Sequence, residues 1–214
     1  MAIMSESIPA VLNLWKKALG SVPDSVWEQT ELEALILADN GLTKASDQLG
    51  NLNRLRMLDL GHNKLTQLPE SLGDIAGLSD FLYLHDNRLS SLPSSIGQLK
   101  KLRYLNLSEN TFSSFPESIC ALPSLIELRI TDNQLATLPH CISNLPHLRE
   151  LHLRNNKLTT LPDSIGMLPE LRQLDLRGNP LTSLLDKLDL RWVNSLKSPS
   201  WIKDLEARGC AVYR

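Results

Sequence analysis

Leucines and asparagines recur along this chain at a nearly constant spacing. Around each recurring asparagine the residues follow the pattern LxxLxLxxNxLxxLPxxIxxL, and residues 148–170 are the cleanest copy. The steps between successive asparagines are 23 residues, apart from a single step of 24: Asn40, Asn63, Asn87, Asn110, Asn133, Asn156 and Asn179. About seven units run from Leu32 to about Leu184. Repetition at one period over this length predicts a solenoid, in which each unit contacts its neighbours.

Each unit predicts the same sequence of local structures. The LxL alternation, as at Leu151 and Leu153, predicts a short strand with one buried face. Strands of successive units would stack in parallel, and the following asparagine would bind backbone groups where the chain leaves the strand. The LPxxI segment would return along the outer side, where Pro162 fixes φ and needs no donor. The leucines of neighbouring units then bury one another.

The two ends of a solenoid need caps. At the N-terminus, we expect a cap over residues 1–31 that is helical before about Leu19 and then becomes a degenerate unit. Lys17 stands there in place of the asparagine, while hydrophobic residues and one proline keep the phase of the repeat: Leu12, Leu14, Leu19, Val22, Pro23 and Val26.

At the C-terminal end, the repeats are expected over residues 32–195, with a shortened eighth strand from Leu188 to Leu190. Residues 196–214 predict a cap in which Ser200 starts a helix and Gly209 ends it, before a final strand. Caps at both ends predict a complete domain.

The segment LHLRNNKLTTLPDSIGMLPE, residues 151–170, resembles the leucine-rich repeat family. Its LPxxIxxL returns are similar to the 23-residue class found in Ras-associated scaffold proteins, plant Ras-group relatives and many bacterial leucine-rich proteins. The resemblance implies an α/β solenoid with a curved, parallel, concave sheet and an irregular or 3₁₀ convex side. It also implies protein binding, and it brings no shared catalytic residues. The first unit departs from the pattern at Ala45 and Ser46, and the seventh at Leu184 and Leu185.

In this fold the strand side chains that point away from the core form an exposed concave face. The earlier units place Met57 and three aromatic residues there, and the later units place arginines and a histidine among acidic residues. Exposed aromatics beside arginines are typical of protein-binding hot spots, although sheets also favour aromatics for packing reasons. The predicted partner-binding residues are Met57, Asp59, Phe81, Tyr83, His85, Tyr104, Arg129, His152, Arg154, Asp175 and Arg177.

The unit from Gly77 to Pro93 is one residue longer than the others. Because Leu82 and Leu84 are the buried pair, the extra residue must lie between Gly77 and Leu82. Two interpretations stay open. A bulge could re-aim Phe81 and Tyr83 into the binding face, or the residue could be a tolerated loop insertion.

Composition narrows the function classes. Hydrophobic residues make up 42% of the 214 residues and charged residues 21%, with a net charge of -2. These values favour a soluble protein without a nucleic-acid groove. The N-terminus shows no signal peptide or membrane span. The few cysteines argue against a disulfide scaffold and favour the cytoplasm.

Candidate metal and thiol sites are weak. Cys120 and Cys141 could lie near each other on the outer side, and we expect them to be free thiols because their spacing is not a zinc signature. His62, His85 and Asp86 are neighbours that could hold a metal weakly. The sequence therefore predicts no metal site, no cofactor and no small-molecule substrate.

The sequence predicts a monomeric, cytoplasmic, non-catalytic module or signalling scaffold that binds another protein on its concave face. The alternative is the substrate-recognition arm of a multi-domain or effector enzyme, of the ubiquitin ligase or kinase type, whose catalytic part is not in this chain.

Overall fold

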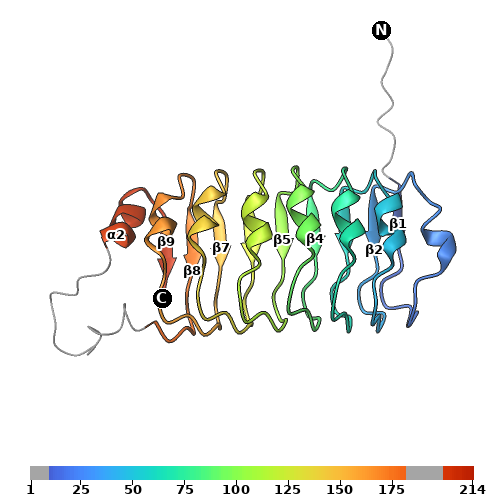
Figure 1. Ribbon diagram of the computed structural model, residues 1–214, viewed down its shortest axis with the longest axis horizontal. Coiled ribbons are helices and arrows are strands. Elements are labelled where there is room, and N and C mark those ends of the chain that lie inside the picture. Colours follow the sequence, from blue (N-terminus) through green and yellow to red (C-terminus); the bar gives the residue numbers. More distant parts are fainter. Residues whose placement is uncertain (1–9, 182–199) are drawn as a thin grey trace, which may run out of the picture.

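The computed structural model describes residues 10–181 and 200–214 as a row of stacked units (Figure 1). Within these residues, nine strands form one open, parallel sheet in chain order. Equivalent positions pair throughout, so that Leu82 lies between Leu58 and Leu105. This confirms the predicted solenoid and its leucine register. The strands are β1 (Val11–Asn13), β2 (Ala34–Ile36), β3 (Met57–Asp59), β4 (Phe81–Tyr83), β5 (Tyr104–Asn106), β6 (Glu127–Arg129), β7 (Glu150–His152), β8 (Gln173–Asp175) and β9 (Ala211–Tyr213).

Short 3₁₀ helices form the return side of the units. Six of them follow a proline whose φ lies between -61° and -77°. The proline carbonyl accepts the first turn's hydrogen bond, as from Leu72 N to Pro69 O at 3.1 Å. In the first unit Ser46 stands in place of proline and its side chain caps the turn by accepting a bond from Gln48 N. The 3₁₀ helices are η1 (Asp24–Val26), η2 (Asp47–Asn51), η3 (Glu70–Asp74), η4 (Ser94–Gln98), η5 (Glu117–Ala121), η6 (His140–Asn144) and η7 (Asp163–Met167).

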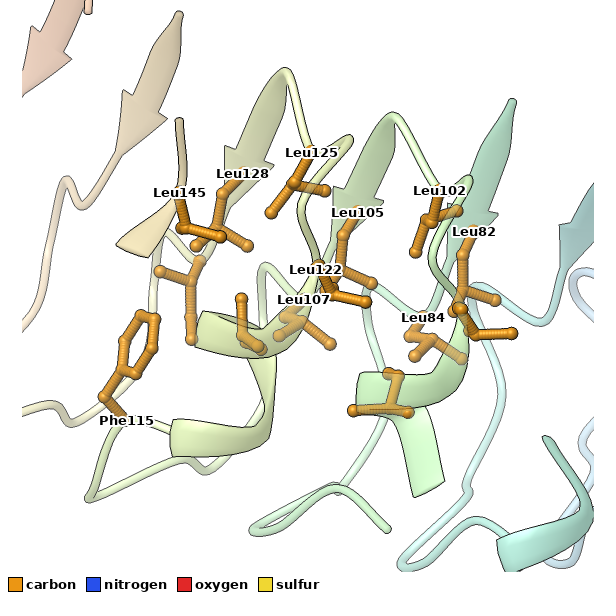
Figure 2. Close-up of a cluster of buried hydrophobic side chains, with 14 of the residues drawn as sticks. Leu82, Leu84, Leu102, Leu105, Leu107, Phe115, Leu122, Leu125, Leu128 and Leu145 are labelled. Carbon is orange, nitrogen blue, oxygen red and sulfur yellow. The ribbon is translucent and has the colours of Figure 1, made fainter. Parts of the chain in front are cut away.

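The hydrophobic core lies between the sheet and these return segments. Leu82 and Leu84 project from the strand side toward the returns, beside Leu105 and Leu107 of the next unit (Figure 2). All four are fully buried. Phe112 and Phe115 occupy leucine positions of the repeat and are also buried. Each unit therefore supplies one slice of a continuous core.

The recurring asparagines satisfy backbone groups of two adjacent units. Asn63 is typical: its Oδ1 accepts bonds from Asn40 N and Leu42 N of the preceding unit. Its Nδ2 donates to Leu37 O of that unit and to Leu60 O of its own. The asparagines are structural, as the pattern predicted.

The predicted N-terminal helix is wrong over the described residues. Val11–Asn13 form the edge strand β1, with Leu12 beside Leu35. The LxL alternation continues into this segment, and a strand there pairs backbone groups that β2 would otherwise leave open. Asn40 closes this end because its Oδ1 accepts bonds from Lys17 N and Leu19 N.

The C-terminal cap consists of helix α2 (Ser200–Ala207) and strand β9. Gly209, at φ +83°, ends the helix as predicted, with Gly209 N donating to Glu206 O and Cys210 N to Leu205 O. β9 pairs directly with β8. The sequence predicted a shortened strand from Leu188 to Leu190 at this position in the sheet, but residues 188–190 lie outside the described part of the chain. Within residues 10–181 and 200–214, no helix has the length and apolarity to cross a membrane.

The extra residue of the long unit is accommodated just before β4. Three successive amides, those of Ser79, Asp80 and Phe81, point at Arg56 O, at 2.9 to 3.3 Å. The equivalent carbonyl of Glu33 receives two, from Arg56 and Met57. The extra residue thus leaves the strand register unchanged.

The prediction of free thiols at Cys120 and Cys141 is wrong, although their proximity is confirmed. They form a disulfide between η5 and η6, with their Cα atoms 5.8 Å apart. Cys120 is the fourth residue of its 3₁₀ helix and Cys141 the second, so the stagger of adjacent returns brings them together. Cys210 is a buried free cysteine.

Candidate functional site

The face of the sheet opposite the core carries all eleven predicted residues. Eight lie on strands β3 to β8, and the other three follow two residues after a strand: His85, Arg154 and Arg177. The structure brings them into an aromatic cluster on β4 and β5 and a charged zone on β6 to β8. Met57 and Asp59 lie on β3 at the edge of the aromatic cluster.

The aromatic cluster consists of Phe81, Tyr83 and Tyr104. The ring centroid of Tyr104 lies 5.5 Å from that of Phe81 and 5.2 Å from that of Tyr83, and Phe81 and Tyr83 stack at 5.8 Å. Phe81 is 41% exposed, which is unusual for a large apolar side chain. Burial raises the pKa of Tyr104 to about 12, so its hydroxyl stays neutral at physiological pH. The cluster offers apolar ring surface and two neutral hydroxyl groups.

Most charges in the charged zone are already paired. Arg129 Nε donates to Glu127 Oε1 at 2.5 Å, and Arg177 NH2 donates to Asp175 Oδ2 at 2.7 Å. The hydrogen bond from Arg177 holds the pKa of Asp175 below its usual value. Asp175 and His152 are only 5% and 7% exposed, so they lie beneath their neighbours rather than at the surface.

Arg154 differs from the other arginines of the predicted set. Its side chain is exposed, and it forms no ion pair with any residue in the described part of the chain. An incoming carboxylate could pair with it without displacing an internal partner.

His62, His85 and Asp86 lie together as predicted. The Nε2 atoms of the two histidines are 3.2 Å apart, and His62 Nδ1 lies 2.6 Å from Asp86 Oδ2. His85 packs over Gly61, where a β-carbon would come within 2.5 Å of the ring. Burial, followed by the proximity of His62, lowers the pKa of His85. Among the described residues these three do not converge as a set of three metal ligands.

A hollow of about 400 Å³ opens beside the aromatic cluster, at the edge where the strands begin. Phe81 and Tyr104 line it together with Arg56 and Arg103, which were not among the predicted residues. Arg56 pairs with Asp80 at 3.0 Å, whereas Arg103 forms no ion pair within the described ranges. Both arginines occupy the second position of their units, and comparing that outward position across units would have found them.

The chain matches the family model described as "Leucine-rich repeat region" at residues 42–138 and 96–189. No curated protein sequence is similar enough to match this chain.

Three solved structures illustrate the similarity. The leucine-rich repeat ectodomain of the receptor kinase GASSHO1/SCHENGEN3 from Arabidopsis thaliana, in complex with CASPARIAN STRIP INTEGRITY FACTOR 2, is 30% identical, with a TM-score of 0.67 over 75% of this chain and 20% of that one. The plant peptide hormone receptor RGFR1 in complex with RGF2 is 26% identical, with a TM-score of 0.70 over 89% and 33%.

An internalin from Listeria monocytogenes is 23% identical, with a TM-score of 0.65 over 88% of this chain and 49% of that one, and shows the fold alone. This chain thus spans between 20% and 49% of the length of these three structures. The repeat pattern, the parallel sheet with its asparagine bonds and the family match together show that the chain belongs to the leucine-rich repeat family.

Proposed function

We propose that this chain is a non-catalytic module that binds a partner protein or peptide on the exposed face of its sheet. The observation that carries the proposal is the cluster of Phe81, Tyr83 and Tyr104, held on adjacent strands with ring centroids 5.2 to 5.8 Å apart. Aromatic side chains on a rigid support lose little conformational entropy on binding. The similar plant receptors, which were solved in complex with CASPARIAN STRIP INTEGRITY FACTOR 2 and RGF2, support this class of function.

The charged zone would contribute mainly to specificity. Arg129 and Arg177 are already bound to acidic residues of their own strands, so a partner gains little by approaching them. Arg154 is exposed and unpaired within the described residues, and it would favour a partner with a carboxylate at the matching position.

The test is affinity purification from a lysate of the native source with matched variants. The double variant Tyr83→Ala/Arg154→Ala removes one aromatic anchor and one cation that has no ion-pair partner among the described residues. The control Met167→Ala/Lys157→Ala removes an exposed apolar side chain and a cation elsewhere; Met167 is 72% exposed on η7.

We expect at least one protein to be captured by the wild type and the control but not by the double variant. Equal capture by all three would refute the assignment of the binding face. Circular dichroism and thermal unfolding would show that each variant remains folded.

The alternative function, a recognition arm for a catalytic part on another segment, has one supporting observation. The similar Arabidopsis structure is the ectodomain of a membrane receptor kinase, and this chain covers 20% of it. Sequencing the full-length transcript would distinguish the two. A reading frame that continues into a kinase or ligase domain would favour the recognition arm.

The cytoplasmic location stays a prediction, and the Cys120–Cys141 disulfide offers its test. Disulfides persist mainly in oxidising compartments. Alkylation of intact cells before lysis, followed by mass spectrometry, would show two alkylated thiols in a reducing compartment and the intact bridge in an oxidising one.

A further inference from the structure

We propose that Glu127, Glu150 and His152 form a binding site for a divalent transition-metal ion, Zn²⁺ in particular. One ligand atom from each of these three residues lies within 4.8 Å of the other two. Glu127 begins β6, and Glu150 and His152 lie on the same face of β7. Within residues 10–181 and 200–214, no other group of three histidine, cysteine, aspartate or glutamate ligands converges in this way.

The spacing of the ligand atoms fits a small ion. His152 Nε2 lies 3.1 Å from Glu150 Oε2 and 3.7 Å from Glu127 Oε1. Two ligands about 2.1 Å from a tetrahedral zinc ion are separated by about 3.4 Å, midway between these values. The mixture of one imidazole nitrogen with two carboxylates suits Zn²⁺ better than Mg²⁺ or Ca²⁺, which prefer oxygen ligands alone.

Charge and burial also point to a cation at this place. Arg129 Nε binds Glu127 Oε1, the same oxygen that faces His152, so a metal ion would share this oxygen with Arg129 or displace it, but no arginine or lysine in the described part of the chain forms an ion pair with Glu150. The imidazole of His152 is only 7% exposed and directs Nε2 toward both carboxylates. That nitrogen therefore carries either a proton shared with the carboxylates or a metal ion, and the experiment must distinguish these two states.

The support of the site is rigid. Leu128, which follows Glu127, and Leu151, which lies between Glu150 and His152, are fully buried and pair in register. Asp175 on β8 lies on the other side of His152 and is held by Arg177. Protein groups supply three ligands, so a fourth would come from water or from a bound partner. Glu127 also lines the hollow beside Tyr104 and Phe81, which places the ion at the border of the proposed binding face.

The inference does not depend on the proposed function, because metal binding is measured on the isolated chain. The full chain is first treated with EDTA and dialysed to remove bound metal. Isothermal titration calorimetry with ZnSO₄ is then expected to show one zinc ion bound per chain. Glu150→Gln keeps the size of the side chain and should weaken binding at least about tenfold. His152→Gln should abolish it.

The matched control is His147→Gln. His147 also pairs with a glutamate, Glu170, at 2.9 Å, but only with that one, so the control should bind zinc like the wild type. A Zn²⁺-dependent rise in the melting temperature, present in the wild type and His147→Gln and absent in Glu150→Gln, would support the site in a second measurement.

Absence of zinc binding by the wild type, or equal binding by Glu150→Gln and His152→Gln, would overturn the inference. The first result would show that the hydrogen bonds of His152 and Arg129 satisfy the two carboxylates without a metal ion. The second would place the ion elsewhere, and the His62–His85 pair would then be the next site to mutate.

Discussion

Replacing Asn133 with alanine tests whether the asparagine bonds hold adjacent units together. Asn133 Oδ1 accepts a bond from Phe112 N at 3.0 Å, and its Nδ2 donates to Leu107 O and Thr131 O, both at 3.0 Å. The two carbonyls keep other donors, Asn110 Nδ2 and Glu109 N. The amide of Phe112 has no second partner among the described residues, so it is the group that alanine would strand.

These contacts set the expected magnitude. Stranding one buried N–H costs about 1–3 kcal/mol, and weakening two carbonyls adds roughly another 1 kcal/mol, for a total of about 2–4 kcal/mol. The measurement is urea-induced unfolding of Asn133→Ala against the wild type, with exchange of the Phe112 amide as a local readout because repeat proteins can unfold in parts.

The control is Asn144→Ala, at an exposed asparagine in η6, which should change stability by no more than about 0.5 kcal/mol. The reasoning would be refuted if Asn133→Ala were as stable as this control and the Phe112 amide remained protected from exchange. In that case the backbone pairing of the sheet and the shared leucine core would hold the units together without the asparagine bonds.

Two further predictions concern stability. Cys141→Ser removes a cross-link between residues 21 apart in sequence and should lower the free energy of unfolding by about 3 kcal/mol. Reducing the wild type should reproduce this loss, and reducing Cys141→Ser should cause no further loss. The pKa of His85 is lower in the folded protein than its usual value of 6.5. In the pH range between the folded-state pKa and 6.5, His85 therefore binds fewer protons in the folded protein than in the unfolded chain. The resulting stability is present above pH 6.5 and is lost as pH falls through the folded-state pKa. His85→Asn should therefore flatten the decline in urea midpoint between about pH 7.5 and 5.5, and an unchanged decline would assign it to other groups.

The period and the leucine positions were enough to predict the strands and their register. Leu82 illustrates why: it must be buried, so the extra residue of its unit can only lie before the strand, and Phe81 still pairs with Met57. Counting residues between the repeats could not show which contacts fix the position of the extra residue. Asp80 binds Arg56, and this contact depends on the side chain of a neighbouring unit.

The N-terminal segment shows where local sequence was misread. Val11–Asn13 pair with β2 because an open sheet edge offers unpaired backbone groups, a tertiary effect that outweighs weak helix propensity. The leucines at positions 12 and 14 already carried the strand signal. The disulfide was missed for a different reason: the proximity of Cys120 and Cys141 was predicted, but the small number of cysteines favoured a reducing compartment and free thiols.

The eighth position of each unit carries a backbone signal that sequence reasoning overlooked. The non-glycine residues there adopt φ between 49° and 56°, and Gly178 adopts 72°, all in the left-handed region. Asparagine, aspartate and histidine tolerate this region better than other non-glycine residues. This preference explains why the eighth position is mostly polar without assigning it a role in binding. The non-glycine residues at this position are Asp39, His62, Asp86, Glu109, Asp132 and Asn155.

The two parts of the exposed face differ in what binding would cost. Covering Phe81 removes apolar surface from water and breaks no internal contact, so it contributes favourably at once. Engaging Arg129 or Arg177 would first disrupt their bonds to Glu127 and Asp175, which largely cancels the gain. Affinity should therefore come from the aromatic cluster. The charge preference of the face should come from Arg103, Arg154 and Arg172, cations of this face that have no ion-pair partner among the described residues, and not from the paired arginines.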